Sequence, residues 1–292
     1  MNRLTTHDRV RILTVLAEGM GVNAACRVTG ASKNTVLKLL ADVGTACALY
    51  QDQTMRSLKL TDIQCDEIWS FIGMKAKNVP ADADPALALG DCYTFTAIDR
   101  DTKLMPCWLV GFRDFASTDA FIEDLHGRLA NRVQLTTDGF GAYPAAVAKH
   151  FGVNVDYAVL NKSYAAGPAV KEAKRRYSPA ECTGTEKKPV CGIPFPERIS
   201  TSHVERSNLT MRMNMRRFTR LTNGFSKKIE NHMHAISFFF MVYNFVKPHG
   251  SLSTKEKPAK RTPAMAAGVA TFQWSIEDIA MMADTVTFEA AK

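Results

Sequence analysis

The chain has 292 residues, of which 46% are hydrophobic and 23% charged, as is typical of a globular protein with room for more than one domain. Its formal net charge of +8 favours a polyanionic partner. Seven cysteines without CxxC spacing argue against a disulfide framework and a simple zinc finger, and favour a reducing cytoplasm. No apolar run is long enough to span a bilayer, so we expect no membrane partner.

The first 43 residues predict three short helices. Thr5 or Thr6 can cap the first, Gly30 provides a tight turn after the second, and Ser32 can cap the third. This pattern is typical of a helix-turn-helix, whose last helix enters the major groove of DNA; the alternative is a small bundle that only packs on the next domain. The residues of the third helix expected to reach phosphates and base edges are Ser32, Lys33, Asn34 and Lys38.

Residues 44–57 predict a connector, after which the pattern changes to alternating β-formers. The elements expected next are antiparallel strands at 58–72, 92–98 and 104–112, a helix at 117–131, a strand at 133–137, a helix at 142–151 and a strand at 153–160. This order predicts a protein of the α/β fold class, in which an N-terminal all-α helix-turn-helix domain is followed by a ribonuclease H-like core with a mixed sheet.

The rest of the expected core is less regular. Residues 161–202 lose periodicity and contain five prolines, so we interpret them as a basic, loop-rich insertion. A helix is then expected to begin at His203 and to continue toward Asn223, followed by a long apolar-faced helix at 226–245. The core domain would therefore span 58–245, and residues 246–292 would form a C-terminal tail.

Three acidic residues suggest chemistry in this frame. Asp66 lies within the first expected strand and Asp138 at the end of the fourth, and these strands are neighbours in a ribonuclease H-like sheet. Glu205 can join them if its helix packs beside the first strand. Clustered carboxylates repel one another unless cations lie between them, and oxygen ligands suit Mg²⁺ or Mn²⁺. Two such ions could support an in-line phosphoryl transfer.

Other acids compete for these places. Glu67 adjoins the first aspartate but should point to the opposite face of a regular strand. Asp62 lies near the start of that strand and is expected to be exposed. Asp156 or Glu230 could replace Glu205 if the helices packed differently, although neither has a flanking asparagine and arginine.

The helix of Glu205 is otherwise cationic or apolar. At helical spacing its face also carries an amide and two guanidinium groups, from Asn208, Arg212 and Arg216. We predict that these three residues contact DNA beside the acidic cluster. The alternative is an ordinary solvated helix face with local ion pairs.

Three segments resemble the acidic motifs of DDE transposases: 65–71 (CDEIWSF), 137–143 (TDGFGAY) and 203–209 (HVERSNL). The last has the form of the glutamate motif in transposases of bacterial insertion sequences of the short-element kind. Arg212 resembles the basic residue that follows the glutamate by two turns in these enzymes. The chain departs from the common pattern in the long insertion between Asp138 and Glu205.

The resemblance implies a DNA transposase that binds insertion-sequence ends and catalyses metal-dependent strand cleavage and strand transfer. It implies that Asp66, Asp138 and Glu205 are catalytic and bind two Mg²⁺ or Mn²⁺ ions, with transposon ends and target DNA as partners. It also implies a homodimer or higher oligomer on DNA, in the bacterial cytoplasm at the nucleoid. Two alternatives stay open: a non-catalytic helix-turn-helix regulator derived from a transposase, and a structure-selective nuclease with the same core.

Overall fold

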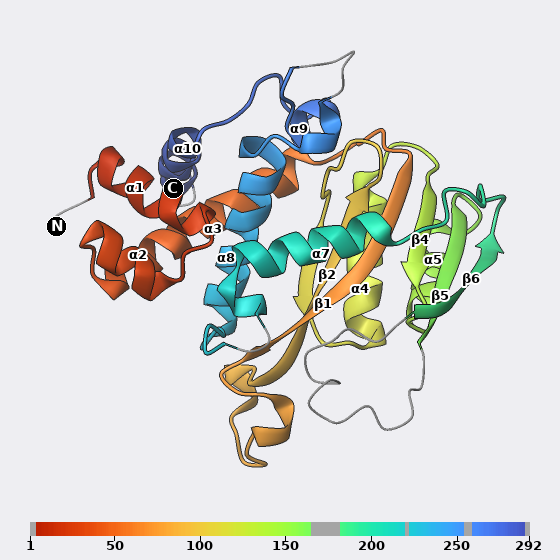
Figure 1. Ribbon diagram of the computed structural model, residues 1–292, viewed down its shortest axis with the longest axis horizontal. Helices are drawn as coiled ribbons and strands as arrows, with labels where there is room; N and C mark the ends of the chain where they lie inside the picture. The colour runs from red at the N-terminus through yellow and green to blue at the C-terminus, as the bar shows by residue number, and fades with distance from the viewer. Residues whose placement is uncertain (1–3, 165–181, 220–221, 254–258, 290–292) are drawn as a thin grey trace.

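The computed structural model describes residues 4–164, 182–219, 222–253 and 259–289 (Figure 1). A six-stranded mixed sheet lies beside a group of helices formed by the N-terminal and C-terminal parts of the chain. Among the described residues, no helix combines the length and the apolar character that crossing a membrane would require.

The N-terminal region forms α1 (Thr6–Ala17), α2 (Val22–Thr29) and α3 (Lys33–Thr54). The Thr5 side chain caps α1 by accepting a hydrogen bond from the Asp8 N–H, and Ser32 caps α3 in the same way. Gly30 ends α2 at a φ of +76°, a left-handed conformation that favours glycine. The predicted helix, turn and helix are therefore present. However, α3 continues through most of the expected connector, where no proline interrupts it.

The sheet has the strand order β3-β2-β1-β4-β5-β6. Its first three strands, β1 (Asp62–Ile72), β2 (Gly90–Asp99) and β3 (Trp108–Gly111), pair antiparallel. β4 (Gln134–Asp138) pairs parallel to β1, and β5 (Asp156–Tyr164) parallel to β4. The connecting helices are α4 (Phe115–Arg128) and α5 (Tyr143–Phe151), and two short 3₁₀ turns, Ala76–Asn78 and Pro85–Leu87, lie between β1 and β2. This is the ribonuclease H-like arrangement, so the predicted fold class is confirmed.

Part of the expected insertion is regular structure, so the loop interpretation of residues 161–202 was wrong there. β6 (Cys182–Cys191) pairs antiparallel with β5, which itself continues to Tyr164. Nearly every residue of β6 is exposed, so the strand has no alternation of buried and exposed positions that a sequence could display. Its backbone pairing with β5 is therefore the main feature that defines it. Residues 165–181 of the insertion lie outside the described residues.

Asp62 is fully buried, so the expectation that it would be exposed was also wrong. Its carboxylate accepts a hydrogen bond of 2.9 Å from Arg198 Nε, and Arg100 lies 3.5 Å away. Arg198 belongs to the segment that leads from β6 to the next helix. This ion pair therefore attaches that segment to the start of β1. The two residues are 136 positions apart in the sequence, so no local sequence pattern predicts their contact.

The predicted glutamate helix is α7 (Ser202–Asn214), and it ends well before Asn223. Met215 leaves the helical region with φ −132° and ψ 102°, and a 3₁₀ turn at Arg216–Phe218 follows. The reason is packing, because this turn brings the Phe218 side chain into the core, where it is 1% exposed. α7 crosses one face of the sheet while α4 lies behind the other (Figure 1).

The C-terminal part joins the two regions. α8 (Ile229–Met241) continues into a π-helical turn at Val242–Val246, and a 3₁₀ turn (Gly250–Leu252), α9 (Pro263–Ala266) and α10 (Ile276–Glu289) follow. α3 packs against α8 so closely that a Cβ added to Gly44 would lie 2.6 Å from the His234 carbonyl oxygen. On the other side, Arg9 of α1 forms an ion pair of 2.6 Å with Asp284 of α10. The N-terminal helices are thus packed firmly on the core.

This contact predicts opposite effects for two glycine substitutions. Gly44→Ala should destabilise the protein by about 1–3 kcal/mol, because the backbone of α8 cannot yield to the new methyl group. Gly127→Ala should stabilise it by about 0.5 kcal/mol, because a Cβ there meets only the end of the Arg56 side chain at 3.8 Å and alanine favours the helix. Chemical denaturation of both variants measures the difference. Equal changes in stability would show that α3 and α8 are not in close contact.

Candidate active site

The pairing of β1 with β4 brings two of the predicted acids together. Cys65 of β1 is paired with Thr137 of β4, so the next residues, Asp66 and Asp138, lie side by side at the end of that pairing. Asp66, Glu67 and Asp138 each offer a carboxylate oxygen, and these oxygens lie within 4.8 Å of one another. The three acids come from two central strands, so the sheet holds them close at a rigid position.

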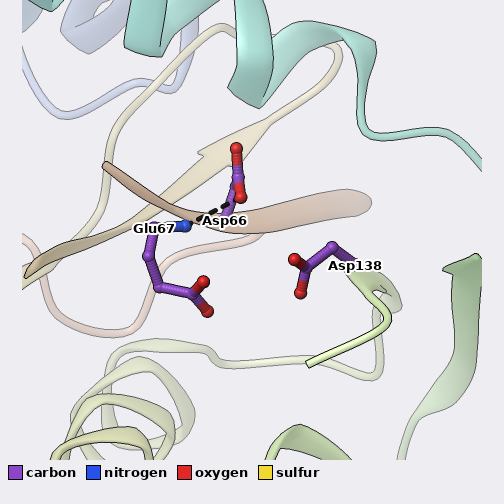
Figure 2. A group of neighbouring side chains, drawn as sticks. All are labelled: Asp66, Glu67 and Asp138. Atoms are coloured by element: carbon purple, nitrogen blue, oxygen red, sulfur yellow. Dashed lines mark hydrogen bonds between the residues drawn. The ribbon is translucent and has the colours of Figure 1, made fainter. Parts of the chain in front are cut away.

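Glu67 is the member of this cluster that the sequence did not predict. Figure 2 shows Asp66 and Glu67 leaving β1 on opposite sides, as expected for neighbours in a strand, with Asp138 beside both. Because β4 ends at Asp138, the Glu67 side chain can still approach it. Only 3% of the Glu67 side chain is exposed, and Arg113 Nε donates a hydrogen bond of 3.3 Å to it. The adjacency of two acids within the first strand was the one signal available.

The surroundings of the cluster disfavour the charged form of its carboxylates. Burial, and then the charges of Asp138 and Glu67, raise the pKa of Asp66 to about 7. Burial and then Asp138 raise the pKa of Glu67 to about 6, although Tyr143 and Arg113 oppose this rise. Burial likewise raises the pKa of Asp138. A cation among these oxygens would relieve the repulsion, and carboxylate oxygens are the ligands that Mg²⁺ and Mn²⁺ prefer.

A buried tyrosine lies against the cluster. The Tyr143 hydroxyl and Glu67 Oε1 are both buried and interact, and this interaction opposes the rise in the pKa of Glu67. The fit to a hard divalent cation comes from the donor set itself, because three carboxylates each offer an oxygen within 4.8 Å of the others.

Glu205 lies near this cluster but outside the group of three. Its carboxylate accepts hydrogen bonds from the Thr201 hydroxyl, at 2.5 Å, and from the Lys162 ammonium of β5. Its charge nevertheless contributes to the raised pKa values of Asp66 and Asp138. The predicted third acid is therefore near the two aspartates but not among the three acids whose oxygens lie together, and its carboxylate is paired to a lysine.

Asn208, one turn after Glu205, makes the direct contact between α7 and the cluster. Its side-chain amide donates a hydrogen bond of 2.8 Å to Asp66 Oδ2. Thr96 of β2 donates to the Asn208 carbonyl oxygen at 3.3 Å, and Asn208 is only 3% exposed. The residue predicted to touch DNA therefore lies inside the protein, where it orients the Asp66 carboxylate.

The remaining predicted DNA contacts are spread over the molecule. Arg212 is half-buried on α7, whereas Arg216 is exposed and lies beyond the end of that helix. At the start of α3, Lys33 and Asn34 are exposed. The Ser32 hydroxyl caps the helix, and Lys38 pairs with Asp42 at 2.9 Å. The expected shared face of Glu205, Arg212 and Arg216 is thus interrupted where α7 ends.

Comparisons with known proteins add little to this geometry. No protein-family model matches the sequence, and no curated protein matches it significantly. Among solved structures, the chain is similar to the piggyBac transposase in a synaptic complex with hairpin DNA, with a TM-score of 0.46 and 9% identity over 99% of this chain and 74% of that one. It is also similar to a chain of the Mos1 strand transfer complex, with a TM-score of 0.24 and 12% identity over 82% and 78%. With scores this low, neither likeness bears on what the chain does.

The site predicts how Mn²⁺ binding should respond to substitution. Asp66→Asn and Asp138→Asn should abolish specific binding, because each removes a charged ligand. Asn208→Ala should weaken binding by about tenfold, as expected when a residue that orients a ligand is lost. Isothermal titration with Mn²⁺ would measure these effects, with the exposed loop variant Asp82→Asn as a control of the same charge change. Unchanged affinity in both Asp66→Asn and Asp138→Asn would show that the cluster binds no metal.

Proposed function

We propose that this chain is a DNA transposase that binds the ends of a bacterial insertion sequence, cleaves DNA strands and joins them to a target. The observation that carries the proposal is the meeting of Asp66 and Asp138 on adjacent central strands of a ribonuclease H-like sheet, beneath a helix that carries Glu205. The resemblance of the three surrounding segments to the motifs of DDE transposases supports it. Asp66, Asp138 and Glu205 would be the catalytic metal ligands, with Glu67 as a fourth acid beside them.

The residues around the cluster prepare it for this role. Asp66 is oriented by the Asn208 amide and by the Glu67 N–H, which donates to it at 2.9 Å. Asp138 is oriented by the Phe140 N–H at 3.1 Å. Mg²⁺ or Mn²⁺ ions held there would supply the charge that activates a water or a 3′-hydroxyl and stabilises the leaving oxygen in phosphoryl transfer. The protein's own contribution is a set of carboxylates fixed before the substrate arrives.

Glu205 would complete the ligand set by exchanging partners. Its side chain is 46% exposed and belongs to the first turn of α7, one turn before Asn208, so a change of side-chain rotamer can redirect it. Lys162 now neutralises its charge, and the lysine charge also partly opposes the rise that burial causes in the pKa of Asp138. A bound cation would take over this neutralising role from the lysine.

The partners follow from the same reasoning. The exposed start of α3 would read the sequence of the transposon ends, as in a helix-turn-helix. Holding two ends together for joining calls for a homodimer or a higher oligomer on DNA. A regulator without catalysis would need no clustered acids, whereas a structure-selective nuclease would need them but would never join strands.

Removing the charge of either aspartate should abolish the reaction. Asp66→Asn and Asp138→Asn should lower the rate of metal-dependent nicking and joining of end DNA by at least about a hundredfold, since charge stabilisation by bound metal is worth several kcal/mol. Gel assays of an end-containing plasmid measure both products, and circular dichroism checks the fold. Glu230→Gln, an exposed acid of α8, should keep wild-type activity. If both aspartate variants remain fully active, the site assignment is wrong.

A precut end with a free 3′-hydroxyl separates the related functions. A transposase joins it to target DNA, a nuclease cuts without joining, and a regulator does neither.

End recognition should depend on the start of α3. Asn34→Ala should weaken binding to end DNA by about 1–3 kcal/mol and leave binding to unrelated DNA almost unchanged, if Asn34 contacts a base edge. Gln53→Ala, an exposed residue at the other end of the same helix, is the control. Gel-shift titrations with end DNA and with an unrelated duplex measure the ratio of the two affinities for each variant. Equal weakening on both duplexes would mean that Asn34 reads no sequence.

A further inference from the structure

A groove of about 780 Å³ lies between the N-terminal helices and the core. Its walls come from the α1–α2 turn, the start of α3, the last turn of α7, the 3₁₀ turn after it, and α8. It is separate from the acidic cluster, since none of Asp66, Glu67 or Asp138 lines it. Its volume is in the range of ligand-binding clefts, about 300–1,000 Å³.

The charged side chains of the groove are almost all basic. Its single acidic lining residue, Glu18, pairs with Lys247 at 3.3 Å. Six further basic residues line it, and none of them pairs with a carboxylate among the described residues: Arg27, Lys33, Arg216, Arg217, Lys227 and Lys228. Six unpaired cations around one concave surface favour a ligand with several negative charges.

Arg217 makes the need for an anion most evident. Its guanidinium donates hydrogen bonds to the Ser226 hydroxyl, at 2.9 Å, and to the Asn231 carbonyl, at 2.8 Å, and both acceptors are neutral. Burial lowers its pKa to about 10. The neighbouring His232 is kept neutral, with a pKa lowered to about 3 by burial and by Arg217. The guanidinium of Arg217 therefore lines the groove with no carboxylate beside it among the described residues, although removing a charge from water without a counter-charge is costly.

Aromatic side chains lie among these cations. Phe225 and Phe239 line the groove as half-buried rings. Tyr243 lies buried behind them, with its ring stacked on Phe239 at 6.3 Å between centroids. Aromatic surfaces interleaved with basic side chains are the pattern of single-strand binding, because bases stack on rings while phosphates meet cations. A free phosphate or a small anion would not need the aromatic surface.

α7 connects the groove to the acidic cluster. Asn208 of this helix holds Asp66, and Asn214, near the other end, lines the groove. They are six positions apart in the helix, which is about 9 Å along the axis. Figure 1 shows α7 extending from the sheet toward α8 and the N-terminal helices. A strand lying in the groove could therefore continue along this helix to the carboxylates.

We propose that this groove binds a single strand of DNA, and that it is the strand on which the acidic cluster acts. That the acidic cluster acts on this strand rests on the proposed function, whereas the binding of single-stranded DNA by the groove does not.

Neutralising two exposed lysines of the groove should weaken this binding. Binding of a short fluorescent oligo-thymidine to the full chain would be measured by anisotropy in EDTA, over a series of salt concentrations. Lys227→Gln/Lys228→Gln should bind about tenfold more weakly at low salt and should reduce the slope of log K against log salt by about 1.4, or about 0.7 for each lost contact. Lys59→Gln/Lys77→Gln removes the same charge from exposed sites outside the groove and should change neither quantity.

Chemical footprinting locates the strand without relying on variants. Oligo-thymidine should protect Lys33, Lys227 and Lys228 from acetylation, as measured by mass spectrometry, and should leave Lys59 and Lys77 reactive. Equal weakening in the two double variants, or protection of the groove lysines by duplex but not by single-stranded DNA, would overturn the inference. Groove-dependent strand binding by a protein that never cleaves DNA would refute the proposed function alone, whereas cleavage without groove-dependent binding would refute only this inference.

Discussion

The parallel pairing of β1 with β4 is the contact on which the rest of this structure depends. It pairs Asp62–Cys65 of β1 with Gln134–Thr137 of β4, so that the residues that follow, Asp66 and Asp138, become neighbours. Because both strands lie inside the sheet, backbone hydrogen bonds on either side hold them in register, and the acids inherit that rigidity. The helices α4 and α7 then cover opposite faces, and α7 is placed where Asn208 can reach Asp66.

The acidic cluster works against the stability of the fold. Three carboxylates in partly buried positions repel each other, which is why the pKa values of Asp66 and Glu67 are raised. The surrounding structure maintains this arrangement through specific contacts, such as Arg113 with Glu67 and Lys162 with Glu205. Such a locally unfavourable cluster is common at sites that bind cations or carry out catalysis. The same reasoning applies to the groove, where the unfavourable charges are positive.

The acidic cluster and the basic groove lie at two ends of one helix. α7 carries Glu205 and Asn208 near the sheet and Asn214 near the groove. The close approach of α3 and α8 at Gly44 and the ion pair of Arg9 with Asp284 attach the N-terminal helices to the core, so the groove has two firm walls. DNA held by α3 and a strand at the carboxylates would thus be positioned by one connected body.

The sequence by itself determined the order of the elements from α1 to β5, the caps at Thr5 and Ser32, and the positions of the two aspartates in their strands, because periodicity, capping and turn residues act between near neighbours. Tertiary structure decided the rest. Glu67 joins the cluster only because β4 ends beside it, and Asp62 is buried only because Arg198 reaches it. α7 stops where Phe218 enters the core, and β6 exists only through its pairing with β5. Each of these features depends on contacts between residues far apart in the chain, which no local pattern records.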